Sequence, residues 1–104
     1  MSDINYEELH LFSELYNDCL NTVYPEYYKD KEFTVNQVLI NNNNSTITGY
    51  IDPFTWKNIR DKVHYFYTLI TGKEPDKNDN NRDIYKGKDV AYIIATIKLV
   101  KSGI

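Results

Sequence analysis

The sequence predicts a mainly α-helical protein, folded as a single small domain over residues 1–104. Two observations support this fold class. Three segments carry apolar residues at the three- and four-residue spacing of an amphipathic helix, and each begins or ends at residue types that start or stop helices. A length of 104 residues suits one hydrophobic core. We therefore expect three longer helices, with one short helix or strand near residues 34–41.

The first helix is expected from about Tyr6 to about Val23. Asn5 is a good N-cap, and Glu8 three residues later completes a capping-box pattern. Pro25 disfavours helical backbone for the residue before it, so the helix should end there. The face predicted to meet the core consists of Leu9, Phe12, Tyr16, Cys19, Leu20 and Val23.

The segment 33–41 has two interpretations. Val35 and Leu39 fit the alternation of a strand that starts at Phe33. Thr34 as an N-cap and Gln37 three residues later instead form a capping box, which favours a short helix. Both interpretations remain open at the level of sequence.

The third helix has the clearest start signal in the chain. Asp52 is the expected N-cap, Pro53 takes the first helical position, and Gly72 is the expected left-handed stop. Residues 73–86 are predicted to form a polar, charged loop. The apolar face of this helix consists of Trp56, Ile59, Val63, Phe66 and Ile70.

The fourth helix is expected from about Lys88 to about Ser102. Lys98 and Lys101 near its end complement the negative end of the helix dipole. We expect this helix to pack against the third one, with the first helix closing the core. Its buried stripe is predicted to be Val90, Ile93, Ile94, Ile97 and Val100.

Composition restricts the classes of function. The net charge is -3, whereas proteins that coat nucleic acids carry concentrated positive charge, so nucleic acid is not an expected partner. No apolar run approaches the roughly 20 residues that span a bilayer, and residues 1–5 lack the features of a secretory signal. The single cysteine, Cys19, cannot form an internal disulfide and should be buried. We expect a cytoplasmic protein without membrane contact.

Two segments carry a family resemblance. The first begins with Gly-Tyr-Ile-Asp-Pro at residues 49–53 and ends at Gly72; the second begins with Asp-Val-Ala at residues 89–91 and ends with Lys-Leu-Val-Lys at residues 98–101. They resemble a family of small helical proteins encoded by tailed bacteriophages of Gram-positive bacteria, staphylococcal phages included. The resemblance covers about the last half of the chain. It implies a helical fold, a phage origin and the host cytoplasm as the location, but no reaction.

No complete catalytic or metal-binding set stands out. All-α nucleotide pyrophosphohydrolases hold Mg²⁺ with carboxylates from two helices. The first predicted helix offers Glu7, Glu14 and Asp18, with His10 between them, but the fourth offers only Asp89. A solvated acidic face is the simpler interpretation. We therefore predict no catalytic residues, no metal and no cofactor, and the sequence favours a binding protein over an enzyme.

Five residues are candidates for anion binding. Lys57, Arg60 and His64 form a basic stripe along the third helix, which could receive a phosphate or an acidic partner. Lys86 and Lys88 flank a glycine just before the fourth helix, where exposed N–H groups bind anions weakly. An ordinary solvated helix face is the alternative interpretation of the stripe.

A tyrosine cluster at Tyr24, Tyr27 and Tyr28 is the candidate protein interface, because tyrosine supplies broad contact area together with a hydroxyl. Three functional hypotheses follow. The first is an accessory protein that binds a host or phage protein, or a second copy of itself. The second is a nucleotide-binding or nucleotide-hydrolysing all-α protein. The third is a weak nucleic-acid binder that uses the stripe on the third helix.

Overall fold

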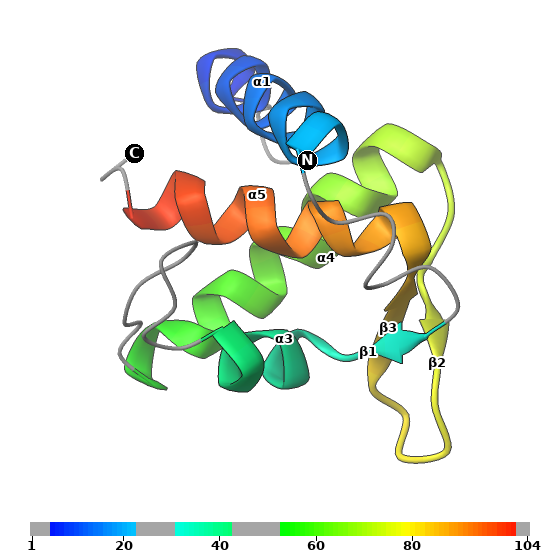
Figure 1. The fold of residues 1–104 in the computed structure, drawn as a ribbon. Coiled ribbons are helices and arrows are strands. Elements are labelled where there is room, and N and C mark those ends of the chain that lie inside the picture. Colours follow the sequence, from blue (N-terminus) through cyan, green and yellow to red (C-terminus); the bar gives the residue numbers. More distant parts are fainter. Residues whose placement is uncertain (1–4, 23–30, 43–52, 102–104) are drawn as a thin grey trace.

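The structure is a computed structural model that describes residues 5–22, 31–42 and 53–101. The predicted mainly α fold is confirmed, with three longer helices, one short helix and a small sheet (Figure 1). None of the helices in these ranges is long and apolar enough to cross a membrane. In chain order the elements are α1 (Tyr6–Thr22), β1 (Glu32–Phe33), α3 (Val35–Asn42), the 3-10 turn η1 (Pro53–Thr55), α4 (Trp56–Thr71), β2 (Asp76–Lys77), β3 (Asp83–Lys86), the 3-10 turn η2 (Gly87–Asp89) and α5 (Val90–Lys101).

Helix α1 starts where the capping pattern predicts. The Asn5 side-chain oxygen accepts a hydrogen bond from the Glu8 backbone N–H at 3.0 Å, which confirms the N-cap. The Glu8 carboxylate binds Lys62 of α4 at 2.9 Å, and so connects the start of α1 to another helix. The predicted end at Val23 lies outside the described residues.

Helix α3 resolves the ambiguous segment in favour of the helix. The Gln37 N–H donates to the Thr34 hydroxyl at 3.1 Å, and the Thr34 N–H donates to the Gln37 side-chain oxygen at 2.8 Å. This complete capping box fixes the first turn. Phe33, just before it, lies in the two-residue strand β1, so the chain changes from strand to helix at Thr34.

Helix α4 differs from the prediction at its start and in its last turn. Pro53 lies in the tighter turn η1, and the α-helix begins at Trp56, because the three residues before it adopt 3-10 geometry. The predicted cap Asp52 lies outside the described residues. Ile70, predicted to face the core, is 45 % exposed because it lies in the last turn, beyond the packed centre of the helix.

The predicted end of α4 is confirmed. Gly72 has a φ of 74°, in the left-handed region, and its N–H donates to the Thr68 carbonyl at 3.0 Å. Glycine takes up this conformation without the strain that a side chain brings.

Helix α5 is the centre of the molecule. Nine of its twelve residues are buried, so it behaves as a core helix rather than as an amphipathic one. In Figure 1 it crosses the middle of the fold, with α1 on one side and α4 passing behind it. Its one fully buried polar side chain, Thr96, donates to the Tyr92 carbonyl at 2.7 Å. The predicted stripe is buried at Val90, Ile93, Ile94 and Ile97, and Val100 is partly buried.

Stacked aromatic rings join the three longer helices. The Phe12 ring of α1 stacks on Phe66 of α4 with a centroid separation of 4.1 Å, and on Tyr92 of α5 at 5.8 Å. Such pairs add to the free energy of burial. Cys19 is fully buried on the same face of α1, as the apolar spacing predicts. The predicted packing of these three helices around one core is therefore confirmed.

The small sheet corrects the prediction of a loop for residues 73–86, which is wrong for Asp76–Lys77 and Asp83–Lys86. Strands β2 and β3 form an antiparallel pair, and β1 adds to the other side of β3 in the order β1-β3-β2. Phe33 lies opposite Tyr85, and both side chains are buried. Strands β2 and β3 are a local hairpin, whereas β1 comes from a distant segment, and strands of two to four residues show too little periodicity to be predicted.

Candidate functional site

A polar cleft of about 580 Å³ lies between the start of α3, the middle of α4 and the turn that joins β2 to β3. Its three walls come from segments far apart in the sequence. The residues that line it are Thr34, Val35, Asn36, Gln37, Arg60, Asp61, His64, Asn78, Asn80, Asn81, Arg82 and Asp83. We refer to this site as the polar cleft.

The first wall is the start of α3. The capping box holds Thr34 and Gln37 in place, so the first turn of the helix is well fixed. The backbone N–H groups of Val35 and Asn36 belong to this turn, where a helix leaves donors without carbonyl partners of its own. The wall therefore presents hydrogen-bond donors together with the positive end of the helix dipole.

The second wall is one face of α4. Arg60 donates to the Asn36 side-chain oxygen at 2.9 Å, and this contact joins the second wall to the first. Asp61, beside it, forms an ion pair at 2.8 Å with Lys57 one turn earlier. Because this pair compensates the Asp61 charge, Arg60 is not neutralised by its sequence neighbour.

The third wall is the β2–β3 turn. The Asn78 side-chain oxygen accepts hydrogen bonds from the backbone N–H groups of Asn80 at 2.9 Å and Arg82 at 3.0 Å. Asn81 adopts a left-handed φ of 61°, which asparagine tolerates better than most residues. These bonds hold the turn in one conformation and place Arg82 at the cleft.

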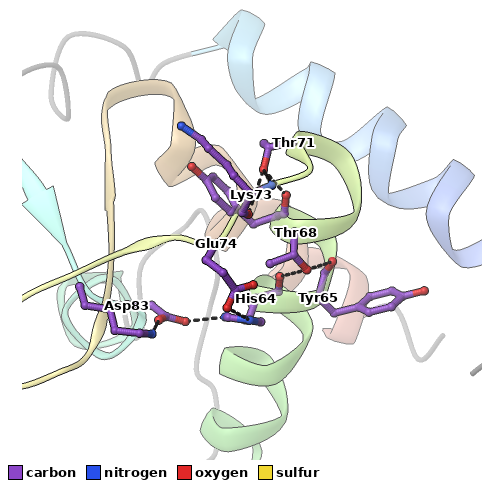
Figure 2. A network of polar contacts seen from close by, with 9 residues as sticks. His64, Tyr65, Thr68, Thr71, Lys73, Glu74 and Asp83 are labelled. Carbon is purple, nitrogen blue, oxygen red and sulfur yellow. Dashed lines mark hydrogen bonds and ion pairs between the residues drawn. The ribbon is translucent and has the colours of Figure 1, made fainter. Parts of the chain in front are cut away.

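His64 connects the second wall to the third (Figure 2). Its Nδ1 atom lies 2.8 Å from the Asp83 carboxylate, and its Nε2 atom lies 3.4 Å from the Glu74 carboxylate. The other oxygen of Asp83 accepts a hydrogen bond from Lys77. Burial alone would raise the pKa of the Asp83 carboxyl, but the bonds from Lys77 and His64 outweigh burial and lower that pKa.

This geometry gives His64 a structural role in the present conformation. A histidine that acts as a general base needs one ring nitrogen directed at the reacting group. Both ring nitrogens here lie beside carboxylates, so the ring fastens the β2–β3 hairpin to α4. Cys19, on α1, is not part of the described cleft lining, and burial raises the pKa of its thiol, whereas a reactive thiol needs a lowered pKa.

The acidic face of α1 brings no further ligands together. His10 lies 3.3 Å from Glu14, one turn away, and both side chains are exposed. Within residues 5–22, 31–42 and 53–101, no group of three His, Cys, Asp or Glu side chains is arranged to hold a metal ion.

The two arginines are the most informative feature of the polar cleft. The chain has twelve lysines and arginines, and only Arg60 and Arg82 are arginines. Both line the cleft, whereas its described lining contains no lysine. In the described part of the chain neither arginine pairs with a carboxylate, while the two cleft carboxylates pair with Lys57 and Lys77. The cleft therefore holds two arginines that lack a carboxylate partner among the described residues, in a protein whose net charge is -3.

Of the five predicted anion-binding residues, the structure brings two together. Arg60 and His64 line the cleft, whereas Lys57 forms an exposed ion pair with Asp61. Lys86 at the end of β3 and Lys88 in η2 are exposed and lie outside the described lining. The predicted interface residues, Tyr24, Tyr27 and Tyr28, lie outside the described residues.

Sequence reasoning missed Arg82, Asn36 and Asp83 as members of the site. The rarity of arginine in a lysine-rich chain was a usable signal, because arginine binds planar oxyanions in a way that lysine does not. The contact between Arg60 and Asn36 spans 24 positions and leaves no local pattern.

No family model, no curated protein and no solved structure matches this chain. The function proposed below is therefore argued from the polar cleft.

Proposed function

We propose that this chain is a non-catalytic binding protein that acts by contact with another protein, and that the polar cleft is its recognition surface. The observation that carries the proposal is the placement of both arginines, without carboxylate partners among the described residues, in one cleft. Arginine is enriched in protein interfaces and among the residues that dominate their binding energy.

The hydrogen-bonding groups of the cleft support recognition of a polar segment. Asn36, Asn78, Asn80 and Asn81 offer amide groups from two walls. The walls are held by the α3 capping box and the Asn78 turn, so they lose little conformational entropy on binding. A rigid polar cleft of this kind favours specific binding, and the placement of His64 between two carboxylates favours binding over catalysis.

The biological setting belongs to the same proposal. The resemblance of residues 49–72 and 89–101 to small helical phage proteins supports an accessory protein encoded by a phage of a Gram-positive host. On this proposal the chain binds a host or phage protein in the host cytoplasm.

A nucleotide-binding protein is the second candidate, because the cleft volume of about 580 Å³ lies in the range of small-molecule sites. The third hypothesis, a nucleic-acid binder, has less support: the Lys57 charge is compensated by Asp61, and His64 lies between Asp83 and Glu74.

Affinity purification with charge-reversed variants tests the proposed function. The tagged chain, its Arg82→Glu variant and its Lys88→Glu variant are each incubated with lysate of a Gram-positive host, and captured proteins are identified by mass spectrometry. Lys88→Glu makes the same charge change at an exposed residue outside the described cleft lining. The proposal expects one stoichiometric protein that is captured by the wild type and Lys88→Glu but lost with Arg82→Glu.

Equal capture by all three chains would refute the cleft as the recognition surface. Loss with Lys88→Glu alone would move the surface to η2. Thermal melts of the wild type and of both variants establish that all three chains are folded. If an untagged copy of the chain is added to the lysate, its capture by the tagged chain would identify self-association.

A further inference from the structure

We propose that the group recognised by the polar cleft is a phosphate monoester, held as a dianion between Arg60 and Arg82. This inference rests on the proposed function, since it assumes that the cleft is the recognition surface. The phosphate has two possible sources, a phosphorylated side chain of the partner protein and a small phosphate ester such as a mononucleotide.

The first step is the choice of arginine. A guanidinium presents several N–H donors in a planar fork that matches two oxygens of one phosphate, whereas a lysine ammonium acts as a point charge. The other ten of the twelve lysines and arginines are lysines, yet the two that line the cleft, on α4 and on the β2–β3 turn, are arginines. A site that needed only positive charge could be built from lysine.

The second step is the charge of the ligand. Asp61 and Asp83 also line the cleft, but Lys57 holds the first at 2.8 Å and Lys77 together with His64 holds the second. Neither guanidinium group then has a carboxylate partner among the described groups. A phosphate monoester near pH 7 carries close to two negative charges, whereas a single carboxylate carries one. A dianion therefore matches the cleft better.

The third step concerns donors for the phosphate oxygen that the two arginine forks leave unbound. The Nη1 group of Arg60 donates to the Asn36 side-chain oxygen at 2.9 Å, and the other N–H groups of this guanidinium are available to a ligand. The N–H groups at the first turn of α3 lie on the first wall, opposite the α4 wall that carries Arg60, and helix N-termini stabilise phosphate through such donors and the dipole. The guanidinium groups and the helix start thus supply donors from different directions.

Nuclear magnetic resonance of the arginine side chains tests this directly. Because the chain has two arginines, its side-chain Nε–H spectrum should contain two signals, which the variants Arg60→Lys and Arg82→Lys assign. Inorganic phosphate is titrated into the folded protein, with glutarate and sodium chloride at equal ionic strength as controls. The proposal expects both signals to move with phosphate along one saturable curve, with clearly smaller shifts in either control.

The lysine variants provide the second readout. Each keeps its positive charge but loses the planar fork, so phosphate affinity should fall by about tenfold. Lys88→Gln, which removes a charge outside the described cleft lining, should leave phosphate affinity unchanged. Movement of only one arginine signal, an equal response to glutarate, or full affinity in both lysine variants would each overturn the inference.

A final comparison separates the sources and the two proposals. Tighter binding of a phosphoserine peptide than of adenosine monophosphate assigns the phosphate to a protein partner; the reverse order assigns it to a small ligand. If the Arg82→Glu chain loses its captured partner while phosphate does not bind, this inference fails and the proposed function stands. If phosphate binds but partner capture is unaffected by Arg82→Glu, the proposed function fails and this inference stands.

Discussion

Asp83 joins the hairpin to α4 through contacts with Lys77 and His64, and it is the carboxylate whose contribution to stability can be tested by pH. Replacement of Asp83 by Asn should lower the free energy of unfolding by about 1–2 kcal/mol at neutral pH, because hydrogen bonds to a charged group are lost. Chemical denaturation measures this difference. Asp61→Asn is the matched control, since its ion pair with Lys57 is exposed and should contribute less than about 1 kcal/mol.

The pH dependence of the Asp83→Asn difference has a defined sign. The folded protein lowers the pKa of Asp83 below the unfolded value of about 3.9. The stabilisation is therefore fully present above the unfolded pKa and is lost as pH falls through the folded pKa. The two proteins should converge in stability in strong acid, and a difference that persists there would contradict this account.

Tyr85 presents the opposite case, a buried polar group without a partner. Its hydroxyl has no hydrogen-bond partner in the described structure, and burial raises its pKa. Tyr85→Phe should therefore raise the free energy of unfolding by about 1 kcal/mol, because an unsatisfied buried hydroxyl is costly. Tyr92→Phe is the control: the Tyr92 hydroxyl is hydrogen-bonded to Tyr16, so its removal should be destabilising. A destabilising Tyr85→Phe, seen in thermal melts, would mean that the hydroxyl does have a partner.

At the scale of elements, the cleft depends on the start of α3. Thr34→Ala removes the hydroxyl that accepts from the Gln37 N–H and should lower stability by about 1 kcal/mol. Thr34→Ser keeps the hydroxyl and should lose much less. Denaturation curves of both variants provide the measurement, and equal losses would show that the threonine methyl group, rather than the cap, matters.

The helices could be predicted from sequence because their signals are local. Asn5 caps α1, Thr34 caps α3 and Gly72 ends α4, and each acts within four residues of its partner. The sheet could not be predicted in this way. Its strands are two to four residues long, and β1 pairs with β3 across about fifty intervening positions of the chain.

The residues of the candidate site likewise divide into those with a local sequence signal and those without one. Arg60 and His64 are four residues apart, so helical spacing alone puts them on one face of α4. Arg82 and Asn36 join them only when the turn and α3 are placed beside that face, which no local pattern shows. The predicted start of α4 is wrong for a different reason. Proline fits the first position of a 3-10 helix as well as that of an α-helix, so Pro53 alone does not tell the two apart.

The stability of the entire fold depends on α5. Ile94 is fully buried, so Ile94→Asp places an unpaired charge in the core and should destabilise the fold by more than about 4 kcal/mol. Ile40→Asp makes the same change at a side chain that is 62 % exposed and should cost less than about 1 kcal/mol. Calorimetry should show a cooperative transition for the second variant only. A cooperative melt of Ile94→Asp near the wild-type temperature would refute the central position of α5.

The central position of α5 also has a consequence for synthesis. Ribosomes make the chain from its N-terminus, so α1, α3 and α4 emerge before the helix against which α1 and α4 pack. Until residues 90–101 follow, Phe12 lacks Tyr92, on which its ring stacks, and the buried side chains of α1 and α4 lack the α5 surface against which these helices pack. The core therefore closes only after α5 has emerged, and a nascent chain that stalls before α5 presents these side chains to chaperones and proteases.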